Sequence, residues 1–374
     1  MKSAAQQAVD GARGALVDLS HRIHSHPELA FEEERAAAWC AEMLDEGGLR
    51  VEAGIVELPT AFVATAGSGP RTIAICAEYD ALPGIGHACG HNVIAAAAVG
   101  AGLGLSRIAD DLGITIKVFG TPAEENGGGK ILMLERGAFD GVDAAMMVHP
   151  APFDMAKLPC LALADLRVRY IGKESHSSVA PERGINAANA LVIAQMAIGL
   201  LREHMSPAAR VHGIVTHGGD APNIVPGHTS GRWLVREKTL DRVIELEQSV
   251  RRCFEAGALA TGASLEVTTA PAYSEFRDDT AMMALYQANA EVLGRTFIDL
   301  AGPGENMAGS TDMANVSRVV RAIHPMIGIG SFPVLNHQPE FAAFCATPVA
   351  DQAIVDGATA LAWTVVDIAE GLSA

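Results

Sequence analysis

Hydrophobic and polar positions follow each other along the chain in blocks that predict buried strands alternating with helices. Short apolar runs at 72–77, 114–119 and 143–148 have the length of strands buried on both faces. The run VIAAAAVGAGLGLSRIA after the first strand is small and apolar on nearly all sides, which predicts a buried helix. Helical spacing at 5–25 and about 348–371 predicts further helices. This alternation predicts an α/β fold with a mixed, mostly parallel sheet and helices on both of its faces.

The pattern changes at about residue 166. The strand LRVRYIG is followed by the helix NAANALVIAQMAIGLLREHM, by strands near 211–217 and 231–237, by a helix at about 241–258 and by the strand SLEVTTA. The order βαββαβ predicts a ferredoxin-like sandwich that can bury its own core. We therefore expect a larger domain formed by residues 1–165 and 276–374, interrupted by a smaller inserted domain at 166–275.

A cysteine between two histidines follows the first predicted strand. The loop AEYDALPGIGHACGHN places His87, Cys89 and His91 at alternate positions. Thiolate and imidazole are ligands that zinc and similar divalent metals prefer. On this spacing alone, a metal site and a free cysteine with two incidental histidines are equally consistent with the sequence.

Metal-binding or acid–base residues also follow the other two predicted strands. Glu124 and Glu125 come shortly after the strand at 114–119, and His149 directly follows the strand at 143–148. Ligands in parallel sheets bind beyond the carboxyl ends of the strands. These residues should therefore meet at one edge of the sheet, which favours the metal site.

Composition narrows the class of protein and its location. The chain has 374 residues, of which 49% are hydrophobic and 19% charged, enough for two domains with a real core. A net charge of −17 argues against nucleic-acid or anionic-membrane partners. No signal peptide, no membrane-length apolar run and no CxxC pair among the six cysteines is evident. We expect a cytoplasmic protein with reduced thiols.

Five motifs in a fixed order resemble a known family. HACGHN, PAEENGGGK, VHP, GKESHSS and NHQPEF are similar to the amidohydrolase branch of metallopeptidase family M20. That branch includes aminobenzoyl-glutamate hydrolases, auxin-conjugate hydrolases and N-acyl amino acid aminoacylases. The form AEYDALPGIGHACGHN most resembles the subgroup of aminobenzoyl-glutamate hydrolase and the β-alanyl-lysine type dipeptidases. The resemblance extends from about His24 to Phe341.

The resemblance implies a catalytic domain with two divalent metal ions, manganese or zinc, interrupted by a lid domain that also forms a homodimer. The implied substrate is a small molecule with an amide bond. Glu124 is implied to be the general base. The implied metal ligands are Cys89, His91, Glu125, His149 and His337. Asp80 is either a carboxylate that orients a ligand imidazole or a turn or helix-capping acid, and the sequence supports both equally.

Further site residues are implied by the lid motifs and by one late loop. His176 in GKESHSS matches a histidine that reaches the partner's active site and stabilises an oxyanion, although a surface histidine is the alternative. Asn223 in GGDAPNIVPG is implied to contact the substrate or the oxyanion. Arg236 could bind a substrate carboxylate or form a surface ion pair. Ser310, near the implied substrate pocket, could also belong to a capped helix start with Thr311 and Asp312.

Three positions depart from the family pattern or lack a family role. Asn92 stands where much of the branch has aspartate, and Glu78 stands where more distant members have a metal-binding histidine. We do not count Glu78 as a ligand. His87 has no matching role, and we expect it to be structural.

Three functions remain open at this stage. The leading hypothesis is hydrolysis of the amide bond in a small N-acyl amino acid or dipeptide. The second is a metal-dependent deaminase acting on an aromatic amine, which would release ammonia. The third is a dimeric metal-binding scaffold without catalysis, which the complete set of expected ligands and base disfavours.

Overall fold

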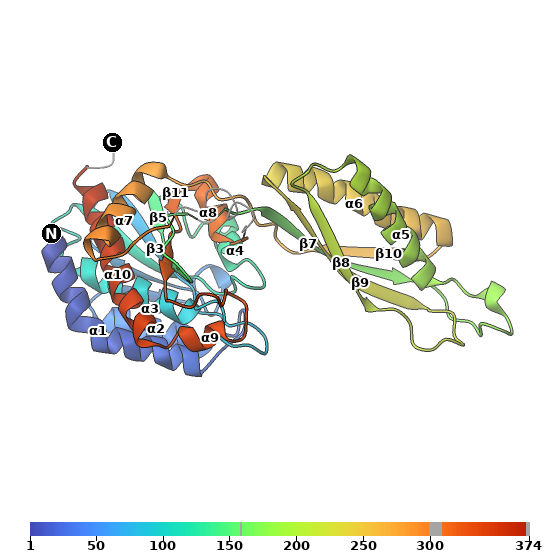
Figure 1. The fold of residues 1–374 in the computed structure, drawn as a ribbon, viewed down its shortest axis with the longest axis horizontal. Coiled ribbons are helices and arrows are strands. Elements are labelled where there is room, and N and C mark those ends of the chain that lie inside the picture. Colours follow the sequence, from blue (N-terminus) through green and yellow to red (C-terminus); the bar gives the residue numbers. More distant parts are fainter. Residues whose placement is uncertain (158, 299–308, 372–374) are drawn as a thin grey trace. The chain divides into compact units, whose positions relative to one another are not determined.

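The computed structural model describes residues 1–157, 159–298 and 309–371 of the chain (Figure 1). These residues form two compact units. Unit 1 is built from Met1–Pro159 and Phe276–Ala374, and unit 2 from Cys160–Glu275. The chain thus leaves unit 1 once, completes unit 2 and returns.

Unit 1 contains a six-stranded mixed sheet. Its strand order is β1(Arg50–Ala53), β2(Phe62–Ala66), β4(Ile114–Gly120), β3(Arg71–Ala77), β5(Ala144–Met146) and β11(Arg321–Ile323). The four strands β4, β3, β5 and β11 run parallel to one another. β2 is antiparallel to both of its neighbours, β1 and β4. A separate parallel pair joins β6(His149–Ala151) to β12(Met326–Gly328).

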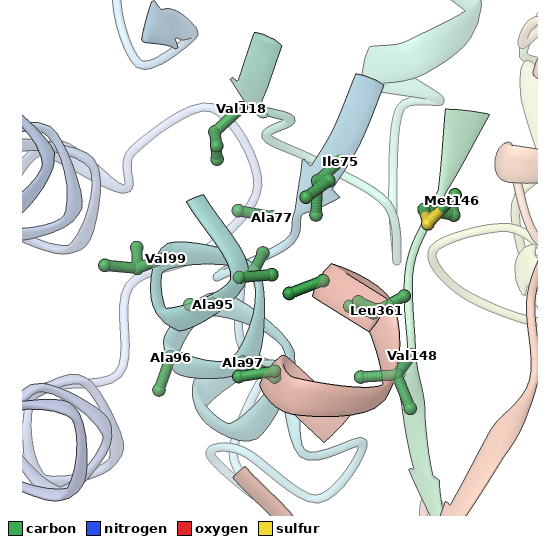
Figure 2. Packing of buried hydrophobic residues seen from close by; sticks show 14 of the residues in the cluster. Ile75, Ala77, Ala95, Ala96, Ala97, Val99, Val118, Met146, Val148 and Leu361 are labelled. Carbon is green, nitrogen blue, oxygen red and sulfur yellow. The ribbon is translucent and has the colours of Figure 1, made fainter. Parts of the chain in front are cut away.

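Helices cover both faces of this sheet. Ile73 and Ile75 of β3 face one hydrophobic cluster, and the alternate residues Ala74 and Cys76 face another, as the two-residue period of a strand requires. The first cluster includes side chains of α1(Lys2–Ser25), α2(Glu34–Glu46), α3(His91–Ser106), α7(Thr280–Val292) and α10(Pro348–Ala369), and Figure 2 shows part of it. The second includes side chains of α4(Gly129–Glu135) and α8(Met313–Val319). The predicted fold class is confirmed.

The most buried helix among the described residues is α3, whose first residue, His91, is a predicted metal ligand. Nearly all of its side chains are buried, which explains why its sequence has no polar face. Short helical elements elsewhere are η1(Ile55–Glu57), η2(Pro181–Arg183), η3(Arg202–His204) and α9(Phe341–Phe344). Across the described residues, we find no helix with the length and apolar character needed to cross a membrane.

One local prediction needs correction. The strand expected at 143–148 ends earlier, at Met146, and His149 instead begins β6, which pairs with β12. The backbone passes there from the six-stranded sheet to the β6–β12 pair, because His149 N donates a hydrogen bond to Pro325 O (2.9 Å), just before β12. Strands β1 and β2 form an antiparallel hairpin, with η1 in the connection between them.

Unit 2 is an antiparallel sheet with two helices. Its strand order is β10(Ser264–Thr269), β7(Ala162–Ile171), β9(His228–Glu237) and β8(Arg210–His217), and the helices are α5(Ala187–Leu201) and α6(Leu240–Thr261). Asn186 caps α5 by accepting hydrogen bonds from Ala188 N and Asn189 N. Side chains of both helices pack with the sheet in one hydrophobic core that belongs to unit 2. The chain order within the unit is βαββαβ.

Close helix packing in unit 1 can be tested at Gly100 of α3. A Cβ atom there would lie 2.8 Å from Leu16 Cδ1 and 2.9 Å from Ala358 Cβ. We expect Gly100→Ala to lower the free energy of unfolding by about 1–3 kcal/mol, because the added methyl group overpacks the contact of α3 with α1 and α10. Urea unfolding followed by circular dichroism measures this change.

Gly14→Ala in α1 is the matched control, because nothing lies within 4 Å of its added Cβ atom. Alanine is the better helix former by about 1 kcal/mol, so this variant should be as stable as the parent protein or more stable. Equal effects of the two substitutions would contradict the packing described for α3.

Candidate metal centre

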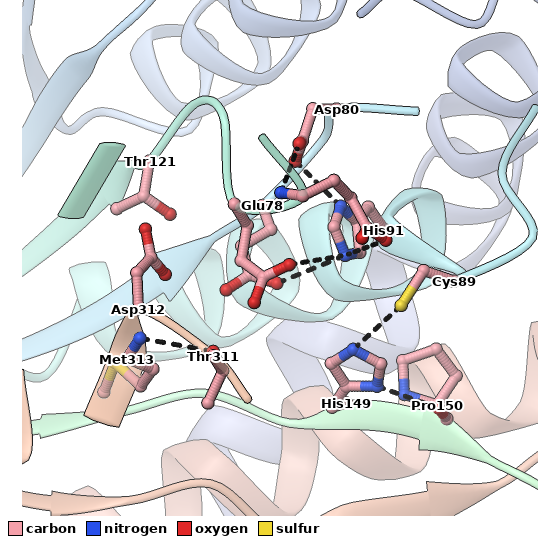
Figure 3. Close-up of polar contacts among 12 residues, drawn as sticks. Glu78, Asp80, Cys89, His91, Thr121, His149, Pro150, Thr311, Asp312 and Met313 are labelled. Carbon is pink, nitrogen blue, oxygen red and sulfur yellow. Dashed lines mark hydrogen bonds and ion pairs between the residues drawn. The ribbon is translucent and has the colours of Figure 1, made fainter. Parts of the chain in front are cut away.

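The predicted metal ligands and the predicted general base Glu124 meet at the edge of the sheet where β3 and β4 end. These two strands are parallel neighbours, so the chain leaves both at the same edge. The loop after β3 carries Asp80 and Cys89 and leads into α3, whose first residue is His91. The loop after β4 carries Glu124 and Glu125. Figure 3 shows polar side chains from these loops directed toward one another.

All five predicted metal ligands lie in one cluster within unit 1. Cys89, His91 and His149 form one group that could hold a metal ion, and Cys89, Glu125 and His337 form another. Within each group the ligand atoms lie within 4.8 Å of one another. Cys89 Sγ is 3.4 Å from His149 Nε2 and belongs to both groups. The arrangement would let two ions share the thiolate.

Asp80 holds two of these residues in place. Its Oδ1 is 2.8 Å from His91 Nδ1, and its Oδ2 accepts a hydrogen bond from Glu125 N (2.9 Å). This is the contact that an orienting carboxylate makes with a ligand imidazole. The other ring nitrogen, His91 Nε2, is buried and has no hydrogen-bond partner in the described part of the chain. It is therefore in position to bind a cation.

The surroundings of His91 Nε2 favour positive charge. Glu78 Oε2 lies 3.5 Å away, Glu125 Oε1 3.7 Å and Glu124 Oε2 3.9 Å. Burial opposes protonation of His91, but Asp80 and the Cys89 thiol raise its pKa well above the ordinary value. The nitrogen thus needs either a proton or a metal ion between it and the carboxylates.

The cluster as a whole has more buried acids than buried bases. Burial raises the pKa of Glu124 well above its ordinary value, and the nearby Glu78 and Glu125 raise it further. Lys130 is the single fully buried lysine or arginine among the described residues. The buried carboxylates around His91 and Lys130 are Glu78, Asp80, Glu124, Glu125 and Asp312. Divalent cations fit such a set, because they offset the charge that burial makes costly.

A glycine sets the spacing between two of the predicted ligands. Gly90 lies between Cys89 and His91 with φ +85°, in the left-handed region, and α3 starts at the next residue. A Cβ atom at Gly90 would lie 2.4 Å from Pro150 Cγ. The turn thus lets the thiol and the imidazole face the same cluster while the backbone packs closely against the residue after His149.

Two non-glycine residues at the site adopt unusual backbone conformations. Ala123, which precedes Glu124, has φ +60°, and His337 has φ +67°. Neighbouring groups hold both positions, since Ala123 N donates to Glu33 Oε1 (2.8 Å) and His337 N donates to Ala88 O (2.8 Å). Strained backbone of this kind is concentrated at functional sites, because the surrounding contacts must compensate for it.

Sequence reasoning missed a buried charge network beside the cluster. Lys130 Nζ lies 2.5 Å from Glu78 Oε1 and 2.7 Å from Asp312 Oδ1, and Lys130 N donates to Asp312 Oδ2 (2.8 Å). Burial raises the pKa of Glu78, but Lys130 and His91 lower it to about 2. Two features of the sequence could have indicated this network. One is the lysine that ends the GGGK motif, and the other is Glu78, which directly follows the buried strand β3.

The network also changes the interpretation of Asp312. This residue precedes α8 but makes no side-chain capping bond, because its carboxylate binds Lys130. Thr311 Oγ1 accepts a hydrogen bond from Met313 N (3.2 Å) (Figure 3). Ser310 is half-buried two residues before Asp312, and its role as a substrate contact stays a prediction.

Two further histidines beside the cluster, His87 and His324, are buried. His149 Nδ1 is 2.9 Å from Pro150 O, and its ring lies 5.4 Å from the ring of His324. Burial lowers the pKa of His149 to about 4 and that of His324 to about 3. His87 packs 6.3 Å from the ring of His24, and burial lowers its pKa to about 3. Neither His324 nor His87 belongs to a metal-binding group found among the described residues.

Asn92, the departure from the family pattern after CGH, has structural contacts. Its Nδ2 donates hydrogen bonds to Ser20 Oγ and to Cys345 O, both at 2.8 Å. The side chain thereby ties the start of α3 to α1 and to the residue after α9.

Three predicted site residues belong to unit 2. His176 and Asn223 lie close together there, because His176 forms a β-bridge with Ile224 and Ser177 N donates to Asn223 O (3.0 Å). Arg236 lies on β9, and burial lowers its pKa. The roles of all three remain predictions.

Comparison with known proteins finds relatives in the family that the motifs resemble. The model of peptidase family M20/M25/M40 matches residues 74–363. The Xaa-Arg dipeptidase of Mus musculus is 37% identical over 386 residues, which cover 98% of this chain and 89% of that protein. A p-aminobenzoyl-glutamate hydrolase subunit of Escherichia coli is 32% identical over 303 residues, with coverage of 75% and 63%.

Solved structures share the fold. A dinuclear metal-binding peptidase of the M20 family from Bacillus subtilis matches with a TM-score of 0.71 and 22% identity, covering 96% of this chain and 99% of that one. The aminobenzoyl-glutamate utilization protein from Klebsiella pneumoniae matches with a TM-score of 0.71 and 21% identity, covering 94% and 97%.

The charge network can be tested by removing its cation. We expect Lys130→Met to lower the free energy of unfolding by about 3–5 kcal/mol, because Glu78 and Asp312 would remain buried without their shared partner. Urea unfolding in the presence of a chelator measures this loss without a contribution from bound metal.

Lys117→Met on β4 is the control for the same substitution. Lys117 is only half-buried and lies outside the ion pairs described, so its replacement should change stability by less than about 1 kcal/mol. If both variants lost equal stability, the importance assigned to the Lys130 network would be wrong.

Proposed function

We propose, on the premise that this chain belongs to peptidase family M20/M25/M40 as its motifs predicted, that it is a dinuclear metal-dependent amidohydrolase. Its substrate is a small N-acyl amino acid or dipeptide. The observation that carries the proposal is the clustering of all five predicted ligands beside Glu124, in a site with excess buried negative charge. Hydrolase names among the relatives support the reaction class.

Two groups of side chains would hold the metal ions. Cys89, His91 and His149 would bind one ion, Cys89, Glu125 and His337 the other, and the mixed sulfur, nitrogen and oxygen donors suit zinc or manganese. When bound, such ions supply a Lewis acid for the scissile carbonyl and lower the pKa of a coordinated water. His91 Nε2 and Glu125 Oε1 support the fit, since both are buried metal-donor atoms without a hydrogen bond in the described chain. Glu125 Oε1 lies 3.4 Å from Nε2 of His337, the other histidine or carboxylate of its group.

Glu124 is the proposed general base. It directly precedes the proposed ligand Glu125, and its carboxylate lies 3.9 Å from His91 Nε2. A carboxylate in this position can take a proton from the attacking water and deliver it to the nitrogen of the leaving amine. Its low exposure, 7%, keeps bulk water away from the transferred proton.

Unit 2 would act as the lid and dimerisation domain. In this proposal His176 donates a hydrogen bond to the oxyanion of the tetrahedral intermediate in the partner's active site. Asn223, its neighbour in unit 2, contacts the same oxygen or the substrate, and Arg236 binds a substrate carboxylate. The assignments of His176 and Asn223 support each other because the two residues lie side by side within one unit.

The relatives suggest where to look for the substrate. The relative named Xaa-Arg dipeptidase matches nearly the whole chain, whereas the one named p-aminobenzoyl-glutamate hydrolase matches three quarters of it. We therefore propose a dipeptide as the first substrate class and aminobenzoyl-glutamate as the second. The acidic surface of the chain adds no preference, since charge of that kind serves solubility in general.

A release assay tests the proposal. The purified chain is incubated with Zn²⁺ or Mn²⁺ and a panel of an Xaa-Arg dipeptide, β-alanyl-lysine, aminobenzoyl-glutamate, indoleacetyl-aspartate and an acyl-glutamine, and released amine is measured. An aromatic amine is incubated in parallel, and released ammonia is measured. We expect cleavage of at least one amide, and its loss on addition of a chelator. Ammonia from an aromatic amine without amide cleavage would support a deaminase, and no turnover with metal bound would support a scaffold.

Glu124→Gln provides the mechanistic control in that assay. We expect kcat to fall by about 10²–10⁴ while bound metal is retained, because the variant lacks the base but keeps the five ligands. Glu135→Gln makes the same change at an exposed position on α4 and should leave kcat unaltered. Full activity of the Glu124 variant would remove it from the mechanism.

A further inference from the structure

A second cluster of metal-ligating side chains lies in unit 2, outside the site described above. His217 is the last residue of β8 and His228 is the first residue of β9, and these strands are antiparallel neighbours. The ten-residue connection between them, GGDAPNIVPG, carries Asp220 near its start. The cluster therefore lies at the end of the hairpin that β9 forms with β8, which is an edge strand of the sheet.

The three side chains converge closely. The imidazole rings of His217 and His228 are stacked, with centroids 4.0 Å apart and planes 5° from parallel. Asp220 Oδ1 lies 3.7 Å from His217 Nε2, and one ligand atom from each residue lies within 4.8 Å of the others. A β-bulge between Val215 and His217 breaks the regular pairing of β8 at the residue that joins this stack.

The side chains of this cluster leave a nitrogen of His217 without a hydrogen bond. A separation of 3.7 Å is too long for a hydrogen bond between Asp220 and His217. His217 Nε2 is shielded from solvent yet has no hydrogen-bond partner in the described part of the chain. A shielded nitrogen without a partner is costly, so this arrangement indicates a group that binds between the three side chains.

We propose that His217, Asp220 and His228 bind a divalent transition-metal ion of the zinc class. Two neutral imidazoles and one carboxylate are donors that zinc takes at about 2.0–2.2 Å, and they leave a further position for water. The set carries one negative charge when both histidines are neutral, which favours a divalent cation. The imidazoles would leave their parallel stack and rotate so that one nitrogen of each, with the Asp220 carboxylate, points at a single ion.

An ion at this site would fix the β8–β9 connection. It would link both strand ends to Asp220, and so shorten the free length of a loop that contains Gly218 and Gly219. The same loop carries Asn223, whose carbonyl accepts a hydrogen bond from Ser177 N. Occupancy would thereby order Asn223 and its neighbour His176. An effect of this ordering on catalysis is the one consequence that rests on the proposed function.

Equilibrium dialysis of the full chain against Zn²⁺, followed by metal analysis, tests the site. The readout is the difference in bound zinc between the parent chain and variants His217→Gln, His228→Gln and Asp220→Asn. We expect each variant to lose one zinc equivalent per chain at a free zinc concentration that saturates the parent. This difference does not depend on how many ions the unit 1 cluster binds.

His212→Gln is the matched control, because His212 lies on the same strand, is exposed and is outside the cluster. It should bind as much zinc as the parent. Cobalt substitution separates the two sites, since a thiolate-to-cobalt absorption band arises from Cys89 and should persist in the three cluster variants. Zinc binding that is unchanged in those variants, or lost equally in His212→Gln, would overturn the proposal, whatever the outcome of the hydrolysis assay.

Discussion

The concentration of buried negative charge at the ends of β3 and β4 is the constraint on which the site depends. Each acid is costly to bury unless a cation lies nearby. Lys130 compensates Glu78 and Asp312 directly, through contacts of 2.5 and 2.7 Å. Asp80 is used to orient His91 and the backbone of Glu125. Positive charge is still needed at Glu124 and Glu125, and this is where the proposed metal ions would lie.

The surrounding fold makes that concentration of charge possible. Parallel strands direct two loops to one edge, and the apolar helix α3 contributes its first residue, His91, to the cluster. Local conformations that most residues avoid then set the final positions, at Gly90 and at His337. The strain at His337 is held by the hydrogen bond to Ala88 O, from the loop that carries Cys89. The ligands are thus fixed by the backbone as well as by each other.

Much of this arrangement could be predicted from sequence, because its signals are local. Apolar runs identified β3 and β4, and the residues after them identified the edge where Cys89 and Glu125 meet. The change of sheet at His149 could not be predicted, because it depends on pairing with β12, far along the chain. The partner of Lys130 was equally hidden, since Asp312 is 182 residues away and resembles a helix cap. In unit 2, the stacked histidines are brought together only by the pairing of β8 with β9.

In the proposed site, two divalent ions compensate the buried charge and share Cys89. Crystals of the full chain grown with Zn²⁺, measured by anomalous scattering at the zinc absorption edge, test it most directly. We expect two peaks about 3.5–4 Å apart, one beside His91 and His149 and the other beside Glu125 and His337. A folded chain with a single peak at this cluster, or with none, would contradict it.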